Sequence, residues 1–233
     1  MGWSRGSPYD SQVGTAGGDR RVEVRADLVD AHTQAFQHVR RRGAVLSAAR
    51  RVEIARCARD AYLDASPPPP WVRPFGDQHL DVAHRVARHA GTVTESWYRQ
   101  MLAEGMSELE WVEVVGIVCA VVPPVAFARA IGAPLPAVDE PLDDEPPTGV
   151  IADPLATATL NWVPVAAPAD ERASVVQALS ALPNEFDNLW RLAAAQYMSD
   201  AEMVDPAWTR GTLSRPQMEL VAGRISRIRE CFF

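Results

Sequence analysis

One segment, residues 108–122, constrains the fold more than any other, because its apolar residues cover almost every face of a helix. The run Ser107-Glu108-Leu109-Glu110 has the pattern of a capping box, which predicts where this helix begins. Pro123-Pro124 predicts its end, since proline lacks the backbone N–H that a helix interior requires. A helix that is apolar on all sides belongs in a protein core or in a subunit interface.

Apolar residues three and four positions apart also cover most of the remaining chain, as in other amphipathic helices. These patterns predict helices over residues 24–42, 47–66, 78–89, 94–105, 125–131, 170–181, 184–198 and 214–233. Pro67 to Pro70 must end the second of these helices. Essentially no strand pattern is present, so the sequence predicts an all-α protein.

The composition narrows the class of protein and of partner. The 233 residues are enough to bury a core, and the 30 acidic residues outnumber the 23 arginines, which gives a net charge of −7. An acidic chain is a poor binder of nucleic acid. No apolar run reaches the ~18 residues of a membrane span, and the N-terminus has no signal-peptide pattern. Three cysteines cannot form a paired disulfide framework. We therefore expect a cytoplasmic protein with neither nucleic acid nor membrane as a partner.

The chain divides by composition into four parts. Residues 1–22 are rich in glycine and read as a disordered leader. Residues 23–132 form a first helical unit, residues 133–168 a Pro-rich acidic linker, and residues 169–233 the start of a second helical unit. A faint repeat supports two related units, because Ser47 and Ser214 each begin a helix whose second turn carries a glutamate between apolar residues, Glu53 and Glu219.

Several other patterns predict no binding site. The cluster Arg40-Arg41-Arg42 with Arg50-Arg51 is expected to be a solvated helix end in preference to a phosphate site. His79, His84 and His89 are five residues apart, whereas chelation from one helix needs three or four, so no metal is expected. No glycine-rich phosphate loop is present, and no cofactor is predicted.

The segment from Leu213 to Phe233 contains Glu219 and, twelve residues later, Cys231. It resembles the helix that enters the active site in the alkylhydroperoxidase-like, carboxymuconolactone decarboxylase superfamily. Peroxidases of that family have a glutamate twelve residues before the first cysteine of a Cys-x-x-Cys-x-x-x-His motif. Residues 181–197 and 105–132 are also similar to helical elements of two-unit members. The resemblance implies the helical carboxymuconolactone-decarboxylase-like architecture, a hydroperoxide substrate, a thiol reductant and homo-oligomers.

The resemblance assigns Glu219 and Cys231 as catalytic residues, with one departure. The second cysteine would stand at position 234 and the histidine four residues later, so we expect a second unit that is truncated at the motif. In the family the second cysteine attacks the peroxide, the histidine and glutamate relay protons, and the first cysteine resolves the sulfenic acid. Cys231 therefore keeps only the resolving role. The expected function is that of a peroxidase-related protein with impaired activity, and whether it is an enzyme stays open.

Alternatives remain beside this hypothesis. The chain could be a non-catalytic helical oligomerisation protein or pseudoenzyme, with Cys231 as an inert thiol and Glu219 as a surface carboxylate. A decarboxylase- or isomerase-like member would use Glu113 or His84 as a base. Glu113 reads either as a first-turn residue favoured by the helix dipole or as a buried carboxylate in a pocket. Cys57 and Cys119 read as small core residues.

Overall fold

The computed structural model describes residues 23–157, 161–167 and 174–228. These residues form eight α-helices, which confirms the all-α prediction: α1 (Ala26–Val39), α2 (Ala48–Leu63), α3 (Gln78–His89), α4 (Glu95–Ala103), α5 (Glu108–Ala130), α6 (Pro183–Gln196), α7 (Asp200–Met203) and α8 (Arg215–Ile228). Two short 3₁₀ helices, Ala90–Thr92 and Ser174–Gln177, lie between them.

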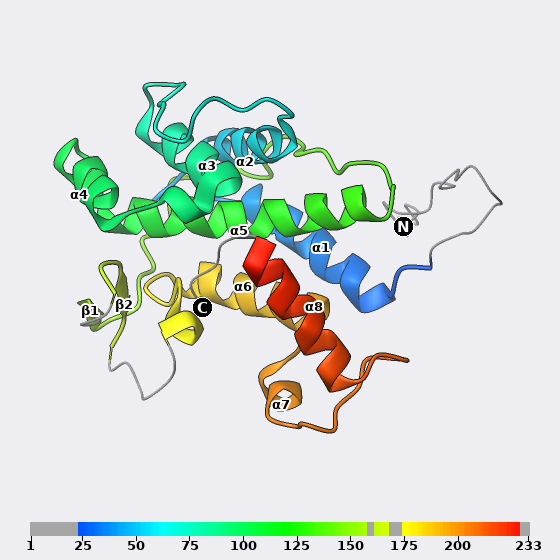
Figure 1. Ribbon diagram of the computed structural model, residues 1–233. Coiled ribbons are helices and arrows are strands. Elements are labelled where there is room, and N and C mark those ends of the chain that lie inside the picture. The colour runs from blue at the N-terminus through cyan, green and yellow to red at the C-terminus, as the bar shows by residue number, and fades with distance from the viewer. Residues whose placement is uncertain (1–22, 158–160, 168–173, 229–233) are drawn as a thin grey trace, which may run out of the picture.

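Helix α5 is the centre of the fold. It contacts α1, α2, α3 and α6, and Figure 1 shows it running through the middle, with α2 and α3 on one side and α1 and α6 on the other. Ile117, Val121 and Val125 are fully buried along it. Among the described helices, α5 alone is long and apolar enough to cross a membrane, but 67% of its most apolar stretch is buried inside the protein. Such burial is that of a core helix.

Local capping sets the starts of these helices. Ser47, Thr94 and Ser107 each accept a hydrogen bond from a backbone N–H three residues on, at the starts of α2, α4 and α5. Ser107 N donates in return to Glu110 Oε2 at 2.7 Å, which completes the predicted capping box.

The predicted end of α5 at Pro123-Pro124 is wrong. The helix continues through both prolines to Ala130 and takes in the short helix expected over residues 125–131. Pro124, Val125 and Ala128 are buried there. Packing of the following apolar turn therefore outweighs the backbone hydrogen bonds that the two prolines cannot donate.

The prediction that the chain has essentially no strands is only partly right. Strand β1 (Leu155–Thr157) pairs antiparallel with β2 (Pro164–Ala166) to form a two-stranded sheet inside the predicted linker. Elsewhere the linker runs along the loop that joins α1 to α2. There Leu142 N donates to Arg40 O at 2.7 Å, and Thr148 N donates to Gly43 O at 2.9 Å. The helix expected over residues 170–181 is wrong for its described part, which has a 3₁₀ helix over Ser174–Gln177 followed by turns.

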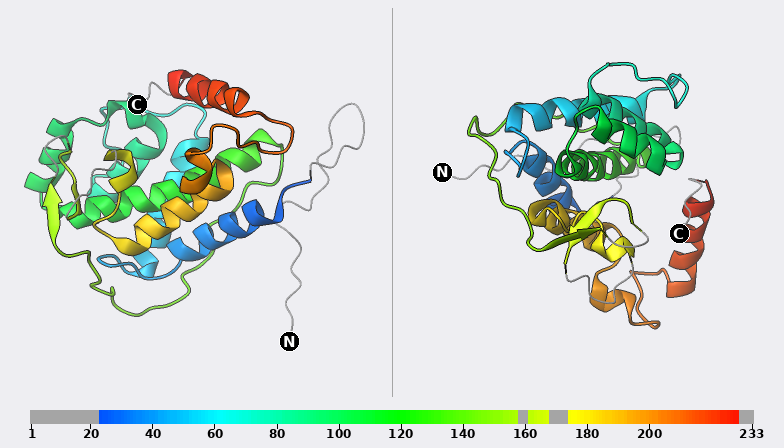
Figure 2. Two further views of the ribbon diagram at one scale, coloured as in Figure 1. Left: turned by 90° about the horizontal axis from the view of Figure 1, so that it is seen from below. Right: turned by 90° about the vertical axis from the view of Figure 1, so that its left-hand side faces the viewer.

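Helices α6 and α8 differ in how much of their surface is buried. Helix α6 packs against α1 and α5, so the two predicted units share one core in this part of the chain. Helix α8 lies at the outside of the molecule in both views of Figure 2, and Met218 is its only buried residue within Arg215–Ile228. The predicted leader and the last residues of the C-terminal helix, 1–22 and 229–233, lie outside the described residues.

Candidate functional site

The carboxylate of Glu219, the first predicted site residue, lies on the surface of α8 in a small polar cluster. Tyr197 Oη donates to Glu219 Oε1 at 3.0 Å, and Arg215 Nε donates to the same oxygen at 2.5 Å. The hydrogen bond from Arg215, followed by the one from Tyr197, lowers the pKa of Glu219. Burial and the bond to Glu219 raise the pKa of Tyr197. Glu219 is therefore an ionised acceptor held in one orientation.

Cys231, the second predicted site residue, lies outside the described residues. Helix α8 is continuous from Arg215 to Ile228. Twelve residues of straight helix span roughly 18 Å, so a carboxylate and a thiol at this spacing do not meet on one uninterrupted helix. The part of α8 that the structure describes does not bring a thiol to Glu219.

The other two cysteines lie half-buried in the helical core, on α2 and α5. Burial is the main cause that raises the pKa of Cys57 to about 12 and that of Cys119 to about 11. Since the thiolate is the nucleophile, neither side chain is activated for attack on a peroxide.

A buried ionic cluster at the centre of the molecule is the least expected feature. Arg51 on α2 has no exposed side-chain surface, and its Nη1 lies 2.5 Å from Glu113 Oε1 on α5 and 2.7 Å from Glu185 Oε1 on α6. Val45 N donates to Glu113 Oε2 at 2.8 Å. The expectation of a solvated helix end is therefore wrong for Arg51, because two carboxylates replace its water.

His38 of α1 joins this cluster at its partly exposed edge. Its Nε2 lies 2.9 Å from both Glu185 Oε2 and Arg51 Nη2. Burial alone would raise the pKa of Glu185, but Arg51 and then His38 outweigh it and lower that pKa to about 2. Burial is also the main influence on Glu113, and it raises the pKa of this carboxyl in spite of Arg51.

Two glycines make room for the cluster. A Cβ atom on Gly43 would overlap the carboxylate of Glu113 and crowd Arg51. A Cβ atom on Gly116 would overlap the carboxylate of Glu185. Both positions therefore require the smallest residue for the ion pairs to close.

Glu113 was expected either as a first-turn residue favoured by the helix dipole or as a buried carboxylate in a pocket. The structure shows a buried carboxylate, but one held in an ion pair and not in a pocket. Glu113 has no exposed surface, and it is not among the residues that line the cavities at His84, at Trp162 or at Arg41. A general base must reach a substrate proton, so a catalytic role for Glu113 has no support. The sequence signal for the cluster was Arg51 itself, because it shares a helix face with Ile54, Ala55 and Ala58.

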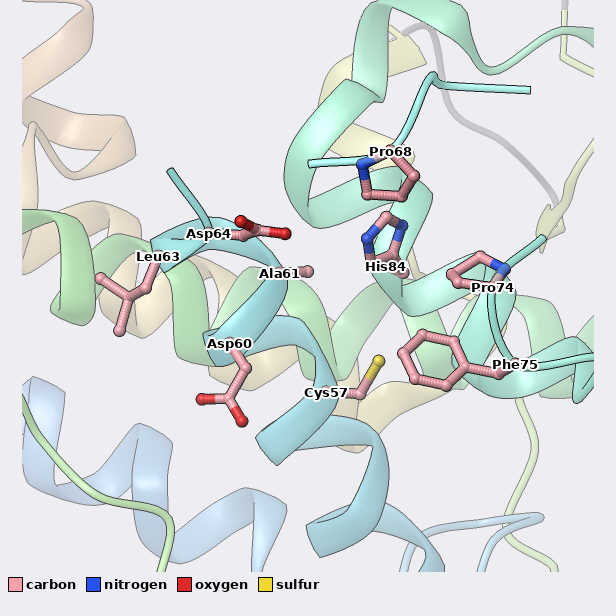
Figure 3. A pocket seen from close by; sticks show the side chains of 9 residues that line it. All are labelled: Cys57, Asp60, Ala61, Leu63, Asp64, Pro68, Pro74, Phe75 and His84. Atoms are coloured by element: carbon pink, nitrogen blue, oxygen red, sulfur yellow. The ribbon is translucent and has the colours of Figure 1, made fainter. Parts of the chain in front are cut away.

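Two of the cavities in the described part of the chain lie away from this cluster. One of about 450 Å³ is apolar and lies between α5 and the β1–β2 region, next to Trp111 and Trp162. The other, of about 600 Å³, lies between α2, α3 and the loop that joins them, and contains Cys57 and His84. Figure 3 shows the second cavity, in which the His84 ring, the Cys57 sulfur and the Asp64 carboxylate face a common space. The structure thus places His84, the other predicted base, in an accessible cavity.

No group of three or more His, Cys, Asp and Glu side chains in the described ranges could hold a metal ion. Comparison with protein-family models, with curated proteins and with solved structures found no match to this chain.

Proposed function

We propose that the chain is a peroxidase-related protein of the alkylhydroperoxidase-like, carboxymuconolactone decarboxylase superfamily, with its thiol chemistry on the segment that contains α8. The observation that carries the proposal is the orientation of Glu219 by Tyr197 and Arg215, twelve residues before Cys231. In this proposal the protein has that family's helical architecture, works in the cytoplasm, and acts on a hydroperoxide at the expense of a thiol reductant.

The ionised state of the carboxylate limits its role in the proposed proton relay. Its hydrogen bonds lower the pKa of Glu219, so the group is ionised at neutral pH. A carboxylate with a lowered pKa is a weaker base than free glutamate, so in this proposal Glu219 orients the relay and balances its charge as a thiol is converted to the attacking thiolate.

The same chemistry assigns the roles of the three cysteines in this proposal. Peroxide reduction needs one thiolate to attack, which releases an alcohol, and a second thiol to form a disulfide and release water. Cys57 and Cys119 have raised pKa values and lie on other helices, so they do not supply the attacking thiolate. Cys231 is left with the resolving role alone.

An extended chain tests this proposal. We expect the 233-residue protein to consume cumene hydroperoxide only slowly in the presence of dithiothreitol. Extension of the chain with a cysteine at position 234 and a histidine four residues later should raise the rate. Glu219→Gln should remove that gain, while Glu202→Gln on α7 should not, and Cys231→Ser should leave the sulfenic acid to slower reduction by dithiothreitol. Circular dichroism confirms folding of each variant. An extended, folded chain with no gain in rate contradicts the proposal.

A second candidate, a helical protein that associates with copies of itself, is favoured by the apolar face of α8. Four large side chains on this helix are between 55% and 75% exposed: Leu220, Val221, Ile225 and Ile228. At 100° per residue they share an arc of roughly 140°, with Glu219 on the opposite face. Association through this apolar face would leave the Glu219 cluster accessible, so the two functions are compatible.

Sedimentation velocity tests the second candidate. We expect the protein to sediment as an oligomer, and Ile225→Gln to shift it towards the monomer by removing apolar area from the contact. Val204→Gln is the matched control, because Val204 is 82% exposed but follows α7 and lies outside the apolar face of α8. A monodisperse wild-type monomer, or equal effects of the two substitutions, contradicts self-association through α8.

A further inference from the structure

The 600 Å³ cavity beside α2 and α3 has the size of a small-molecule site and is not used by the proposed function. Its walls are the last two turns of α2, the Pro-rich loop after that helix, and the middle of α3. Pro68, Pro74 and Phe75 give it an apolar rim, and Figure 3 shows these rings around the His84 side chain.

One carboxylate faces the interior of this cavity. Figure 3 shows the Asp64 side chain directed towards the space in front of His84, whereas Asp60, one turn earlier, points away. Ser66 N donates to Asp64 Oδ1 at 2.9 Å, which holds the carboxylate in place. Asp60 instead accepts a hydrogen bond from Arg59 Nη1 at 2.8 Å. Asp64 is therefore the acidic group available to a bound molecule.

His84 is a buried polar side chain without a polar partner. Only 7% of its surface is exposed, and among the described residues no hydrogen bond reaches either of its ring nitrogens. Its neighbours are rings: Phe75, with centroids 5.9 Å apart, and His89, with centroids 6.3 Å apart. Neither ring nitrogen is among the buried polar atoms that lack a partner in the described residues, so the ring opens on the cavity and can bond to water or to a bound molecule.

The carboxylates of Asp60 and Asp64 are the acidic groups among the described residues that line the cavity. No arginine is among the described residues that line it. After burial, the next causes that raise the pKa of the Cys57 thiol are the carboxylates of Asp60 and Asp81, which pair with Arg59 and Arg73. Burial, followed by the charge of His89, lowers the pKa of His84. His84 thus presents a neutral ring that can accept a hydrogen bond.

We propose that this cavity binds a small organic cation, an ammonium or guanidinium group on a compact apolar body. Asp64 pairs with the charge, a ring nitrogen of His84 accepts a hydrogen bond from the same group, and Phe75 packs against the apolar body. An anion would meet the Asp64 carboxylate without a compensating arginine. A bare metal ion lacks a third ligand, since no metal-binding group is found among the described residues.

Titration of the full chain with benzylamine, followed by calorimetry and by NMR shifts of the His84 ring, tests the site. Benzyl alcohol and benzoate are the neutral and anionic probes of similar shape. We expect saturable binding of benzylamine, with movement of the His84 resonances, and weaker binding of both other probes. Asp64→Asn should weaken benzylamine binding by about 3- to 5-fold, the effect of losing one partly exposed ion pair.

Asp30→Asn is the matched control, since it removes the same charge from an exposed position on α1 that does not line the cavity. It should leave benzylamine binding unchanged. Equal affinity for benzylamine and benzyl alcohol, an equal effect of the two aspartate substitutions, or no saturable binding in the millimolar range would each overturn the proposal. None of these outcomes depends on thiol chemistry or on α8, so the cation site and the proposed function can fail independently.

Discussion

Arg51 and Glu113 form an ion pair of 2.5 Å between Nη1 and Oε1, and neither side chain has any exposed surface. The pair joins α2 to α5 across the middle of the protein, and Glu185 adds α6 to it. Burial of charge costs free energy that is recovered only when every partner is present. The cluster is therefore the point where loss of one side chain should affect the whole fold.

Arg51→Leu should lower the free energy of unfolding by about 3–5 kcal/mol, because it leaves two carboxylates buried without their cation. Urea unfolding followed by circular dichroism measures this loss. Arg99→Leu is the control, since Arg99 is half exposed and its contact with Glu95 spans 3.5 Å. It should cost less than about 1 kcal/mol. Equal losses in the two variants would show that the cluster has no special role.

Gly43→Ala should destabilise the protein by about 2 kcal/mol or more, since the added methyl group occupies the position of the Glu113 carboxylate and forces the ion pair apart. Gly223→Ala on α8 should have the opposite effect on stability. No atom lies within 4 Å of a Cβ placed there, so the substitution should stabilise by about 0.5–1 kcal/mol through helix propensity alone. Thermal unfolding of the two variants distinguishes these signs, and stabilisation by Gly43→Ala would contradict the packing described for Glu113.

Stability should fall between pH 6.5 and about pH 4 because of His32. Burial lowers the pKa of this histidine from 6.5 to about 4, so between these values the unfolded chain binds a proton that the folded chain does not. Such a group contributes stability that is fully present above pH 6.5 and is lost as the pH falls to 4, by at most about 3 kcal/mol.

Urea unfolding of the wild type and of His32→Leu across this pH range measures the effect of His32. The variant should be less dependent on pH between 6.5 and 4, whatever its absolute stability. Parallel pH profiles for the two proteins would contradict a buried neutral His32.

Cys57 and Cys119 should react slowly with a disulfide reagent in the folded protein. Their pKa values of about 12 and about 11 leave almost no thiolate at pH 8. The Cys231→Ser variant contains only these two thiols. A colorimetric assay with Ellman's reagent measures how many of them react and how fast. We expect no rapid reaction in buffer and reaction of both thiols in urea. A fast thiol in the folded variant, traced with Cys57→Ser, would restore a candidate nucleophile in the first unit.

The helices themselves could be predicted because their signals are local. Ser47, Thr94 and Ser107 each bond to a backbone N–H only three residues away, so the sequence around each serine or threonine contains the whole interaction. The all-α class followed from the same patterns. The predicted pair of Glu219 and Cys231 stays a prediction, since Cys231 lies outside the described residues.

The sequence predictions failed where the structure depends on packing between segments far apart in the chain. Pro123 and Pro124 are helix breakers by local chemistry, but the buried turn that follows them keeps α5 continuous. The cavity beside His84 likewise depends on a loop that approaches α3 from the end of α2, and no spacing along either helix encodes that approach.

By itself the sequence determined that this protein is helical, where most of its helices begin, and that one apolar helix belongs in a core or in a subunit interface. Only the tertiary structure decided that Arg51, 62 residues from Glu113 and 134 from Glu185, is buried between them. The physical reason is that helix capping and periodicity act over one or two turns. The free energy of a buried charge depends on which distant side chains replace its water.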